Sequence, residues 1–223
     1  MYSAKLITAV LVLLMGFSLV VFAADEQAPV VPKEKTVLFN GTDLSGWKLF
    51  LGDSEIDVTR VWKVKDDMIL CAGRPNGYMR TEKAYADYKL HVEWQWVQKP
   101  GNSGVLVHMS GEDKVWPRSI ECQLQHGSAG DFWVIDGTEF KEHTADSDRV
   151  NDRNVKKLHD ASEEEPGQWN TYEIICKDDW IVVIVNGVVQ NIATGCNVKS
   201  GKICIQSEGA PVTFRNIYIE PIE

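Results

Sequence analysis

An acidic side chain and two amide side chains alternate with apolar residues in the segment 119–127, SIECQLQHG. Successive side chains of a β-strand point to opposite faces, so Glu121, Gln123 and Gln125 would share one face of a strand. A carboxyl group can hold or move a proton, and amides can orient a ligand that is rich in hydroxyl groups. The same pattern also fits the solvated face of an ordinary sheet, so other parts of the chain must decide between the two interpretations.

Two histidines lie near this acid in the sequence. In the segment 102–109, NSGVLVHM, alternation places Leu106 and His108 on one face, so His108 could meet Glu121 if the two strands are neighbours. His126 falls on the face opposite to Glu121 under strict alternation. It reaches the same site only if the strand ends or bulges near Gln125.

Aromatic and charged residues flank the same segment. Asp131 and Trp133 follow it in a turn-rich stretch, and Trp116 and Arg118 precede it. Polar groups beside aromatic rings are typical of sugar sites, because the ring packs on the C–H groups of a pyranose while carboxylates and amides bind its hydroxyl groups. A rim or core tryptophan is an equally good interpretation of Trp116.

The histidines and loop acids also allow a divalent metal, although their spacing matches no compact metal motif. A site of mixed nitrogen and oxygen ligands would use His108, His126, His143, Glu121 and Glu139. A calcium site in a loop would use Asp146, Asp148, Asn151 and Asp152, which form no EF-hand pattern. The metal, if there is one, is therefore not identified by the sequence.

Composition and missing motifs exclude several classes of function. The formal net charge is −9, whereas nucleic acids and anionic membranes bind basic surfaces. GxSxG, P-loop, GxGxxG and HExxH motifs are missing. The compact Glu-x-Asp-x-x-Glu array of jelly-roll glucanases is missing too, which disfavours a standard two-carboxylate glycosidase. We therefore expect a neutral or polar ligand, with no nucleic acid and no membrane as partners.

The N-terminal segment has the pattern of an export signal. Lys5 precedes a long apolar run, and small residues end at Ala23, which predicts a cleaved signal peptide over residues 1–23. An uncleaved anchor is the alternative, since the apolar run is long for a signal. No cysteine lies near the junction, so a lipoprotein is not expected, and the mature protein should be periplasmic or secreted. Residues 24–35 are polar and contain proline, which predicts a flexible lead-in to a single domain over residues 36–223.

Short β-strands must position the candidate site. Runs rich in Val, Ile, Trp and Tyr alternate with turn residues from Thr36 onward, and no apolar period near 3.6 persists long enough for a major helix. Asn186-Gly187 predicts a two-residue hairpin turn. These features predict an all-β fold in which two antiparallel sheets form a sandwich or jelly roll. The charged segment 141–168 is predicted to be a long loop, functional or mobile.

The cysteines do not form a disulfide scaffold. Their number, five, is odd, and no CxxC pair is present. Most lie in apolar runs, so we expect mainly buried thiols, with one disulfide possible after export.

Five stretches together resemble an exported bacterial family, once called DUF1080, that is described as 3-keto-disaccharide hydrolase or 3-keto-glucoside-1,2-lyase/3-keto-2-hydroxy-glucal hydratase. They are LFNGTDLSGW (38–47), NSGVLVH (102–108), IECQLQHGSAGDFW (120–133), PGQWNTYEIICKDDWIVVIVNGVV (166–189) and GKICIQSEGAPVTFRNIYIEPI (201–222). The resemblance covers essentially the whole mature chain in order. It implies a concanavalin A-like jelly roll, in agreement with the strand pattern.

The resemblance also implies an activity on carbohydrates that carry a ketone at C3. A base removes the proton at C2, an acid protonates the departing glycosidic oxygen, and water can then add, which completes a net hydrolysis. Carried over onto this chain, Glu121 or His126 would be the acid or base, and His108, Arg118 and Gln123 would orient the substrate or stabilise the enolate. Trp116, Trp133 and Asp131, which the residue pattern already indicates as sugar contacts, would complete the substrate site, and a divalent metal stays an open option. This chain has His108 and His126 where relatives often have other residues, so the base is not assigned.

Two other functions compete with this one. A carbohydrate-binding module without catalytic activity would keep the same lectin-like groove, and a conventional glycoside hydrolase would cleave glucosides that are not oxidised. The second of these needs another well-placed carboxylate, which the sequence does not identify.

Overall fold

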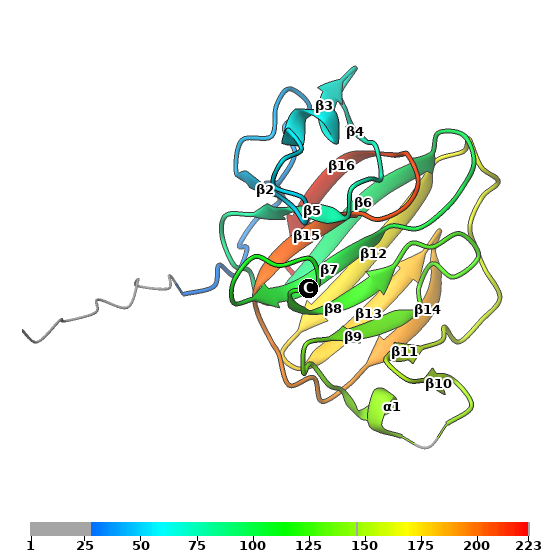
Figure 1. The fold of residues 1–223 in the computed structure, drawn as a ribbon. Coiled ribbons are helices and arrows are strands. Elements are labelled where there is room, and N and C mark those ends of the chain that lie inside the picture. The colour runs from blue at the N-terminus through cyan, green and yellow to red at the C-terminus, as the bar shows by residue number, and fades with distance from the viewer. Residues whose placement is uncertain (1–27, 146, 223) are drawn as a thin grey trace, which may run out of the picture.

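The protein is described here by a computed structural model that covers residues 28–145 and 147–222. Two antiparallel sheets of eight strands each are stacked face to face, with β7, β8 and β9 in front of β12, β13 and β14 in Figure 1. This confirms the all-β jelly-roll sandwich predicted from the sequence.

The strands fall into two groups, which we call the rear sheet and the front sheet. The rear sheet has the order β14 (Val188–Ala193), β13 (Trp180–Val185), β12 (Asn170–Lys177), β6 (Tyr88–Trp96), β16 (Val212–Glu220), β4 (Met68–Cys71) and β3 (Trp62–Lys65), with β1 (Thr36–Val37) paired to β16. The front sheet has the order β10 (Val150–Asn151), β11 (Asn154–Val155), β9 (Phe132–Ile135), β8 (Arg118–Gln123), β7 (Gly104–Ser110), β15 (Lys202–Ser207), β5 (Gly77–Thr81) and β2 (Trp47–Leu51).

The core lies between the sheets because each strand buries alternate side chains. In β6 the buried positions include Tyr88, Trp94 and Trp96, and the residues between the buried ones are only half-buried. In β8 the apolar residues Ile120 and Cys122 join the same core. Alternate residues of β8 must therefore point to the outer face of the front sheet. That outer face contains Glu121 and Gln123, the polar residues that alternate with Ile120 and Cys122.

The hairpin between β13 and β14 forms as predicted. Val185 pairs with Val188 across the turn. The two residues between them, Asn186 and Gly187, have φ values of 48° and 80°. Positive φ at both central residues is the property that selects Asn-Gly for this type of turn.

The segment 141–168 is more structured than a plain loop. It contains the four-residue helix α1 (Lys141–Thr144) and the strands β10 and β11, which extend the front sheet beyond β9. The other helical element among the described residues is the 3₁₀ turn η1 (Val58–Arg60). In the part of the chain that the structure describes, no helix is both long and apolar enough to cross a membrane.

Only some of the predictions for the N-terminal segment concern residues that the structure describes. The predicted signal peptide, residues 1–23, lies outside them. The predicted flexible lead-in is bound to the domain at Val30, whose backbone N–H donates to Ala84 O at 2.8 Å and whose carbonyl accepts from Ala86 N at 3.1 Å. All five cysteines are free and buried, which confirms the expectation of buried thiols.

Candidate functional site

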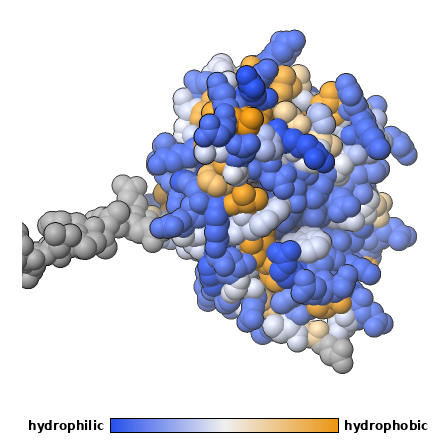
Figure 2. Space-filling view, in the orientation of Figure 1, coloured by the Kyte–Doolittle hydropathy of each residue, from blue (hydrophilic) through white to orange (hydrophobic). Residues whose placement is uncertain are grey.

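The outer face of the front sheet has a small apolar cluster of its own beneath a polar surface. Tyr78, Leu106, Met109, Ile135 and Cys204 pack together there, apart from the main core. In the view of Figure 2 most of this side of the molecule is hydrophilic, with hydrophobic residues in patches at the top and along the middle. The cluster supports the strands from which the candidate side chains project.

A pocket of about 280 Å³ opens on this face, and it contains the acid that the sequence singled out. Its walls come from β8, β9, the strand ends next to β7 and β15, and two loops. The lining residues are Asn102, Trp116, Glu121, Gln123, Gln125, Trp133, Ile135, Arg153 and Glu208.

A glycine lets two polar side chains converge at the base of the pocket. Gly104 begins β7, between β8 and β15. A β-carbon at Gly104 would lie 2.6 Å from Glu121 Oε1 and 2.1 Å from Gln206 Oε1. Any other residue at this position would have to displace both side chains. Gly104 therefore creates the space in which the Glu121 carboxyl and the Gln206 amide meet.

Two carboxyl groups in the pocket hold protons more tightly than ordinary glutamates. Glu121 is 5% exposed, and its Oε1 has no hydrogen-bond partner. Burial, and after it the negative charge of Glu208, raise the pKa of Glu121 to about 8, against smaller opposing effects of Gln206 and Arg153. Burial also raises the pKa of Glu208 to about 7. Near neutral pH the pair can therefore offer one protonated and one ionised carboxyl group.

Amide groups supply hydrogen-bonding capacity around these carboxyls. Gln123 Oε1 accepts hydrogen bonds from the backbone N–H groups of Leu124 and Gln125, both at 2.9 Å. This fixes the side-chain oxygen and leaves the NH₂ group of Gln123 as a donor at the pocket wall. Asn102 also lines the pocket, and its Oδ1 is buried without a partner. The pocket thus contains donors and acceptors that are not used within the protein.

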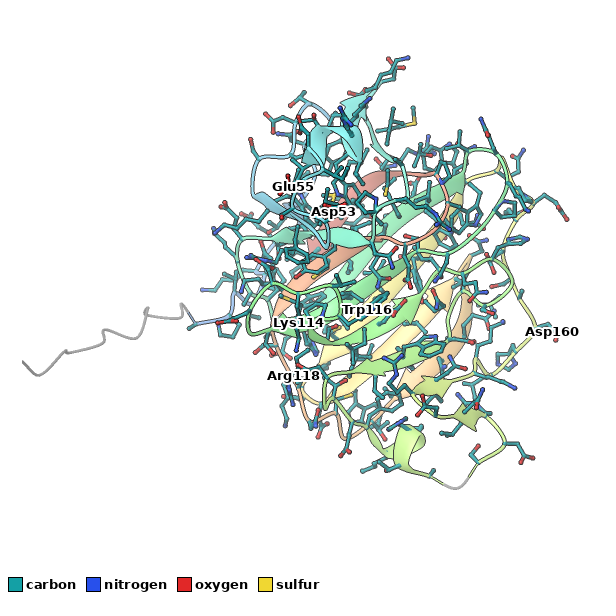
Figure 3. All side chains as sticks on the ribbon, in the orientation of Figure 1. Asp53, Glu55, Lys114, Trp116, Arg118 and Asp160 are labelled. Carbon is teal, nitrogen blue, oxygen red and sulfur yellow. The ribbon has the colours of Figure 1, made fainter. Side chains whose placement is uncertain are left out.

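Two tryptophans and one arginine form the sides of the pocket. Trp133 comes from β9, and Arg153 from the turn between β10 and β11 lies over its ring at 5.5 Å. Trp116, on the loop between β7 and β8, is 41% exposed, and in Figure 3 it lies over the middle of the front sheet. The structure therefore brings together Glu121, Gln123, Trp116 and Trp133, four of the residues predicted from the sequence.

His108 does not reach this pocket, so its expected convergence with Glu121 is wrong. The register between β7 and β8 shifts between Val107 and Ser110, and His108 adopts a φ of 57°. This bulge breaks the alternation and turns the imidazole inward. His108 is 1% exposed, its ring lies 6.3 Å from that of Tyr88, and burial lowers its pKa to about 4.

His126 also lies away from the pocket. Strand β8 ends at Gln123, which meets the condition set for His126 to change sides. Even so, His126 Nδ1 lies 3.5 Å from Glu163 Oε1, and it is not among the lining residues. Glu163 also accepts hydrogen bonds from the backbone N–H groups of Gly127 and Ala129. This pair therefore holds the turn after β8 in place.

Arg118 and Asp131, the other predicted contacts with substrate, make bonds within the protein. Arg118 Nη2 donates to Gly137 O at 3.5 Å. Asp131 is buried, and its Oδ1 accepts from Lys157 N at 2.9 Å. Neither residue lines the pocket, and Asp131 serves to join the turn after β8 to the charged segment 141–168.

The expected metal ligands are not brought together. His108 points inward, His126 pairs with Glu163, and His143 lies on α1 with its Nε2 3.1 Å from Asp152 O. Within residues 28–145 and 147–222, no three His, Cys, Asp or Glu side chains are grouped so that they could hold a metal ion. Asp146, one residue of the alternative calcium set, lies outside the described residues. A divalent metal stays a prediction.

Sequence reasoning missed four polar residues that line or adjoin the pocket: Asn102, Arg153, Gln206 and Glu208. The signal for two of them was present. In KICIQSEG, alternation places Gln206 and Glu208 on one face, in the same pattern as Glu121 and Gln123. Arg153 comes from the charged segment, where no period indicates which side chain faces the sheet.

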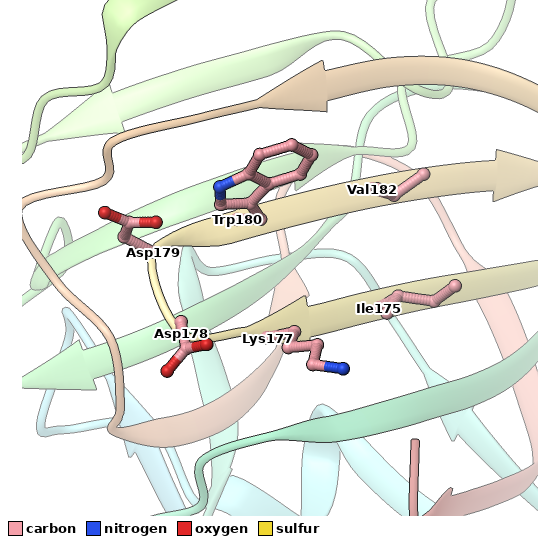
Figure 4. A pocket seen from close by; sticks show the side chains of 6 residues that line it. All are labelled: Ile175, Lys177, Asp178, Asp179, Trp180 and Val182. Atoms are coloured by element: carbon pink, nitrogen blue, oxygen red, sulfur yellow. The ribbon is translucent and has the colours of Figure 1, made fainter. Parts of the chain in front are cut away.

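Other hollows lie on the rear sheet and lack this combination of groups. One, shown in Figure 4, is formed at the turn between β12 and β13 by residues that include Trp180, Ile175 and Val182. Another contains Glu93, an acidic residue of β6. Glu93 is paired there with Arg215 Nε at 2.6 Å. These arrangements leave the front-sheet pocket as the strongest candidate for chemistry.

Comparison of the sequence with protein families gives one match. The family model described as 3-keto-alpha-glucoside-1,2-lyase-like domain matches residues 34–220. No protein of curated function is similar enough in sequence to be matched.

Several solved structures with the same fold are named for carbohydrate-related proteins. A protein described as a "putative glycosyl hydrolase" from Parabacteroides distasonis has 23% identity and a TM-score of 0.62, over 85% of this chain and 94% of that chain. The carbohydrate binding module CBM66 from Bacillus subtilis has 10% identity and a TM-score of 0.57, over 78% and 95%. The β-glucanase of Bacillus licheniformis has 13% identity and a TM-score of 0.56, over 84% and 97%. At these identities the similarities establish the fold alone.

Proposed function

Because this chain belongs to the 3-keto-alpha-glucoside-1,2-lyase-like family, we propose that it cleaves 3-keto-glucosides or 3-keto-disaccharides by 1,2-elimination in the front-sheet pocket. The observation that carries this proposal is the presence of two glutamates, Glu121 and Glu208, in one small pocket beside Arg153 and two tryptophans. An elimination needs one base and one acid, and this pair can supply both.

The chemistry follows from the ketone. A carbonyl group at C3 acidifies the hydrogen at C2, so a carboxylate can remove that proton and leave an enolate with its charge on the C3 oxygen. The electron pair then forms the C1–C2 double bond, and the glycosidic oxygen leaves with a proton from the acid. No oxocarbenium ion is formed, so the carboxylate spacing of ordinary glycosidases is not required.

We assign the base role to Glu208 and the acid role to Glu121. Glu121 is the more deeply buried of the two and has the higher pKa, about 8, so at neutral pH it retains its proton and can give it to the leaving oxygen. Glu208, with a pKa of about 7, is partly ionised at that pH and can accept the proton from C2. The proximity of the two charges favours the state in which the pair holds one proton.

Donors and aromatic surfaces around the carboxyls complete this assignment. The guanidinium of Arg153 and the NH₂ group of Gln123 are available to stabilise the enolate oxygen, where negative charge develops. Trp116 and Trp133 offer ring faces to the C–H groups of the sugar. Water that enters after the aglycone leaves can add at C1, with a proton to C2, which makes the overall reaction a hydrolysis.

The experiment that tests this function compares two substrates. The mature protein is incubated with a 4-nitrophenyl 3-keto-glucoside and with the same glucoside before oxidation, and release of 4-nitrophenol is followed. Release from the oxidised substrate alone is the expected result. Release from the unoxidised glucoside would favour a conventional glycoside hydrolase. Binding without release from either substrate would favour a carbohydrate-binding module.

We also propose that the protein is exported and that its first 23 residues are removed. The apolar run after Lys5 and the small residues before Ala24 support this. Mass spectrometry of the protein in the periplasmic and culture fractions tests it. A chain that begins at Ala24 is expected, whereas a full-length chain in the membrane fraction would favour an uncleaved anchor.

A further inference from the structure

The loop between β7 and β8 lies against the front sheet and carries Trp116 to the pocket. In Figure 3, Trp116 lies over the middle of the front sheet, while Lys114 of the same loop and Arg118, the first residue of β8, lie farther to the left. A surface loop such as residues 111–117 holds one position on a sheet only if specific contacts offset the conformational entropy that it loses. The position of the Trp116 ring therefore depends on what anchors residues 111–117.

Asp113 is the main anchor of this loop. Its Oδ1 accepts hydrogen bonds from Tyr78 Oη at 2.9 Å and Arg80 Nε at 2.6 Å, and its Oδ2 accepts from Arg80 Nη2 at 2.7 Å. Tyr78 and Arg80 belong to β5, which is separated from β7 by β15. The carboxylate thus ties the loop across the sheet by three hydrogen bonds, two of them in the bidentate geometry that arginine favours.

The β5 residue Tyr78, which donates to Asp113, is itself held firmly in place. Tyr78 is fully buried, and its ring stacks on that of Phe50 in β2 at 5.2 Å. Val115, between the anchor and Trp116, packs so closely on Gly52 that a β-carbon there would lie 2.5 Å from Val115 Cγ2. These contacts fix the loop at Asp113 and at Val115, directly before Trp116, which lines the pocket.

A second tether in the loop provides a comparison. Lys114 Nζ lies 2.7 Å from Asp136 Oδ2, and both side chains are about half exposed. Exposed ion pairs of this kind contribute little, whereas the Arg80 side chain in the Asp113 anchor is only 11% exposed. Two neighbouring residues of one loop therefore differ in how firmly they hold it.

We propose that Asp113 is a positioning residue that fixes Trp116 as the sugar platform of the pocket and so determines the affinity for substrate. This inference rests on the proposed function for its kinetic consequence, but not for the anchoring itself. Asp113 would act through Trp116 and would not take part in proton transfer. Its loss should weaken binding of the sugar and leave the chemical step unchanged.

The test compares Asp113→Ala and Asp113→Asn with Lys114→Ala as the matched control. For turnover of a 3-keto-glucoside we expect KM to rise by about tenfold in Asp113→Ala with kcat unchanged. Asp113→Asn, which can still accept from Tyr78, should show a smaller rise. Lys114→Ala should leave both constants unchanged. A fall in kcat with KM unchanged, or an equal effect of Lys114→Ala, would overturn the proposal.

Amide hydrogen exchange separates the anchoring from the activity. Exchange of residues 111–116 should accelerate in Asp113→Ala and not in Trp116→Ala, because the second variant keeps the anchor. Unchanged exchange in Asp113→Ala would show that the residue does not hold the loop, and would overturn the proposal even with KM altered. If the wild-type protein has no turnover, calorimetric binding of the same 3-keto-glucoside replaces KM. Weaker binding in Asp113→Ala then supports the anchor while the proposed function fails.

Discussion

The Glu121 carboxyl and the Gln206 amide meet above Gly104, each from a strand next to β7. A β-carbon on that glycine would lie 2.6 Å from Glu121 Oε1 and 2.1 Å from Gln206 Oε1. Contacts this short are not tolerated, so the two side chains occupy space that only glycine leaves free. The proposed acid therefore depends for its position on a residue that has no side chain.

Gly104→Ala should remove activity more than stability. The atoms that meet the new methyl group are the ends of two side chains, which can move, so we expect a loss of stability of only about 1–3 kcal/mol. The displaced Glu121 carboxyl, however, should lower kcat/KM by at least about 100-fold. Urea unfolding and steady-state kinetics measure the two effects, with Ser110→Ala on the same strand as a control. A folded Gly104→Ala variant with full activity would show that the convergence is not needed.

The leaving group should distinguish the roles of the two glutamates. Glu121→Gln lacks the proposed acid, so it should be severely impaired with a 3-keto-disaccharide but much less with a 4-nitrophenyl 3-keto-glucoside, whose leaving group needs little protonation. Glu208→Gln lacks the proposed base and should be impaired with both substrates. Kinetics with the substrate pair measure this. The opposite pattern would exchange the two roles, and unimpaired variants would remove both residues from the mechanism.

The pH dependence of kcat/KM should be bell-shaped, with its maximum between the two pKa values. As pH falls through about 7, Glu208 takes up a proton and can no longer act as base, so the rate decreases. As pH rises through about 8, Glu121 loses its proton and can no longer act as acid, so the rate decreases again.

Removal of Glu208 should also shift the titration of its partner. The Glu208 charge raises the pKa of Glu121, so in Glu208→Gln the proton on Glu121 should be lost at a lower pH. NMR titration of the Glu121 carboxyl in the wild-type and variant proteins measures this. An unchanged pKa would contradict the coupling of the two carboxyls.

The two pocket tryptophans should affect binding, and an exposed tryptophan elsewhere should not. Trp116→Ala and Trp133→Ala each remove a ring face from the pocket, so KM should rise by about 5- to 100-fold. Trp180→Ala is a suitable control because Trp180 is 55% exposed at the turn between β12 and β13 (Figure 4), on the rear sheet. Equal effects of all three substitutions would mean that the ring faces of the pocket do not contact the sugar.

Strand alternation predicted the fold and a part of the site. It placed Glu121, Gln123 and Gln125 on one face, and all three line the pocket. It failed for His108 because a bulge between Val107 and Ser110 reverses the alternation, and nothing in NSGVLVHM marks that bulge. A single residue in an unexpected backbone conformation was enough to move a candidate catalytic group to the core.

The remaining site residues depend on which strands are neighbours. Glu208 follows β15, which lies next to β7 although almost a hundred positions separate them in the sequence. The sequence pattern indicates that Glu208 and Gln206 share a face of a strand. It does not indicate that Glu208 lies near Glu121, because strand order is set by how the two sheets pack. Arg153 comes from a turn that has no period at all.

The fate of the hydrogen at C2 tests the elimination mechanism most directly. The mature protein is allowed to turn over a 3-keto-glucoside in D₂O, and the sugar product is examined by NMR. Free 3-keto-glucose in the same buffer corrects for exchange without the enzyme, and Glu208→Gln serves as the second control. The elimination mechanism predicts that every product molecule has lost its original C2 hydrogen, either as the unsaturated sugar or, after hydration, with deuterium at C2. Product that retains protium at C2 after cleavage would contradict it.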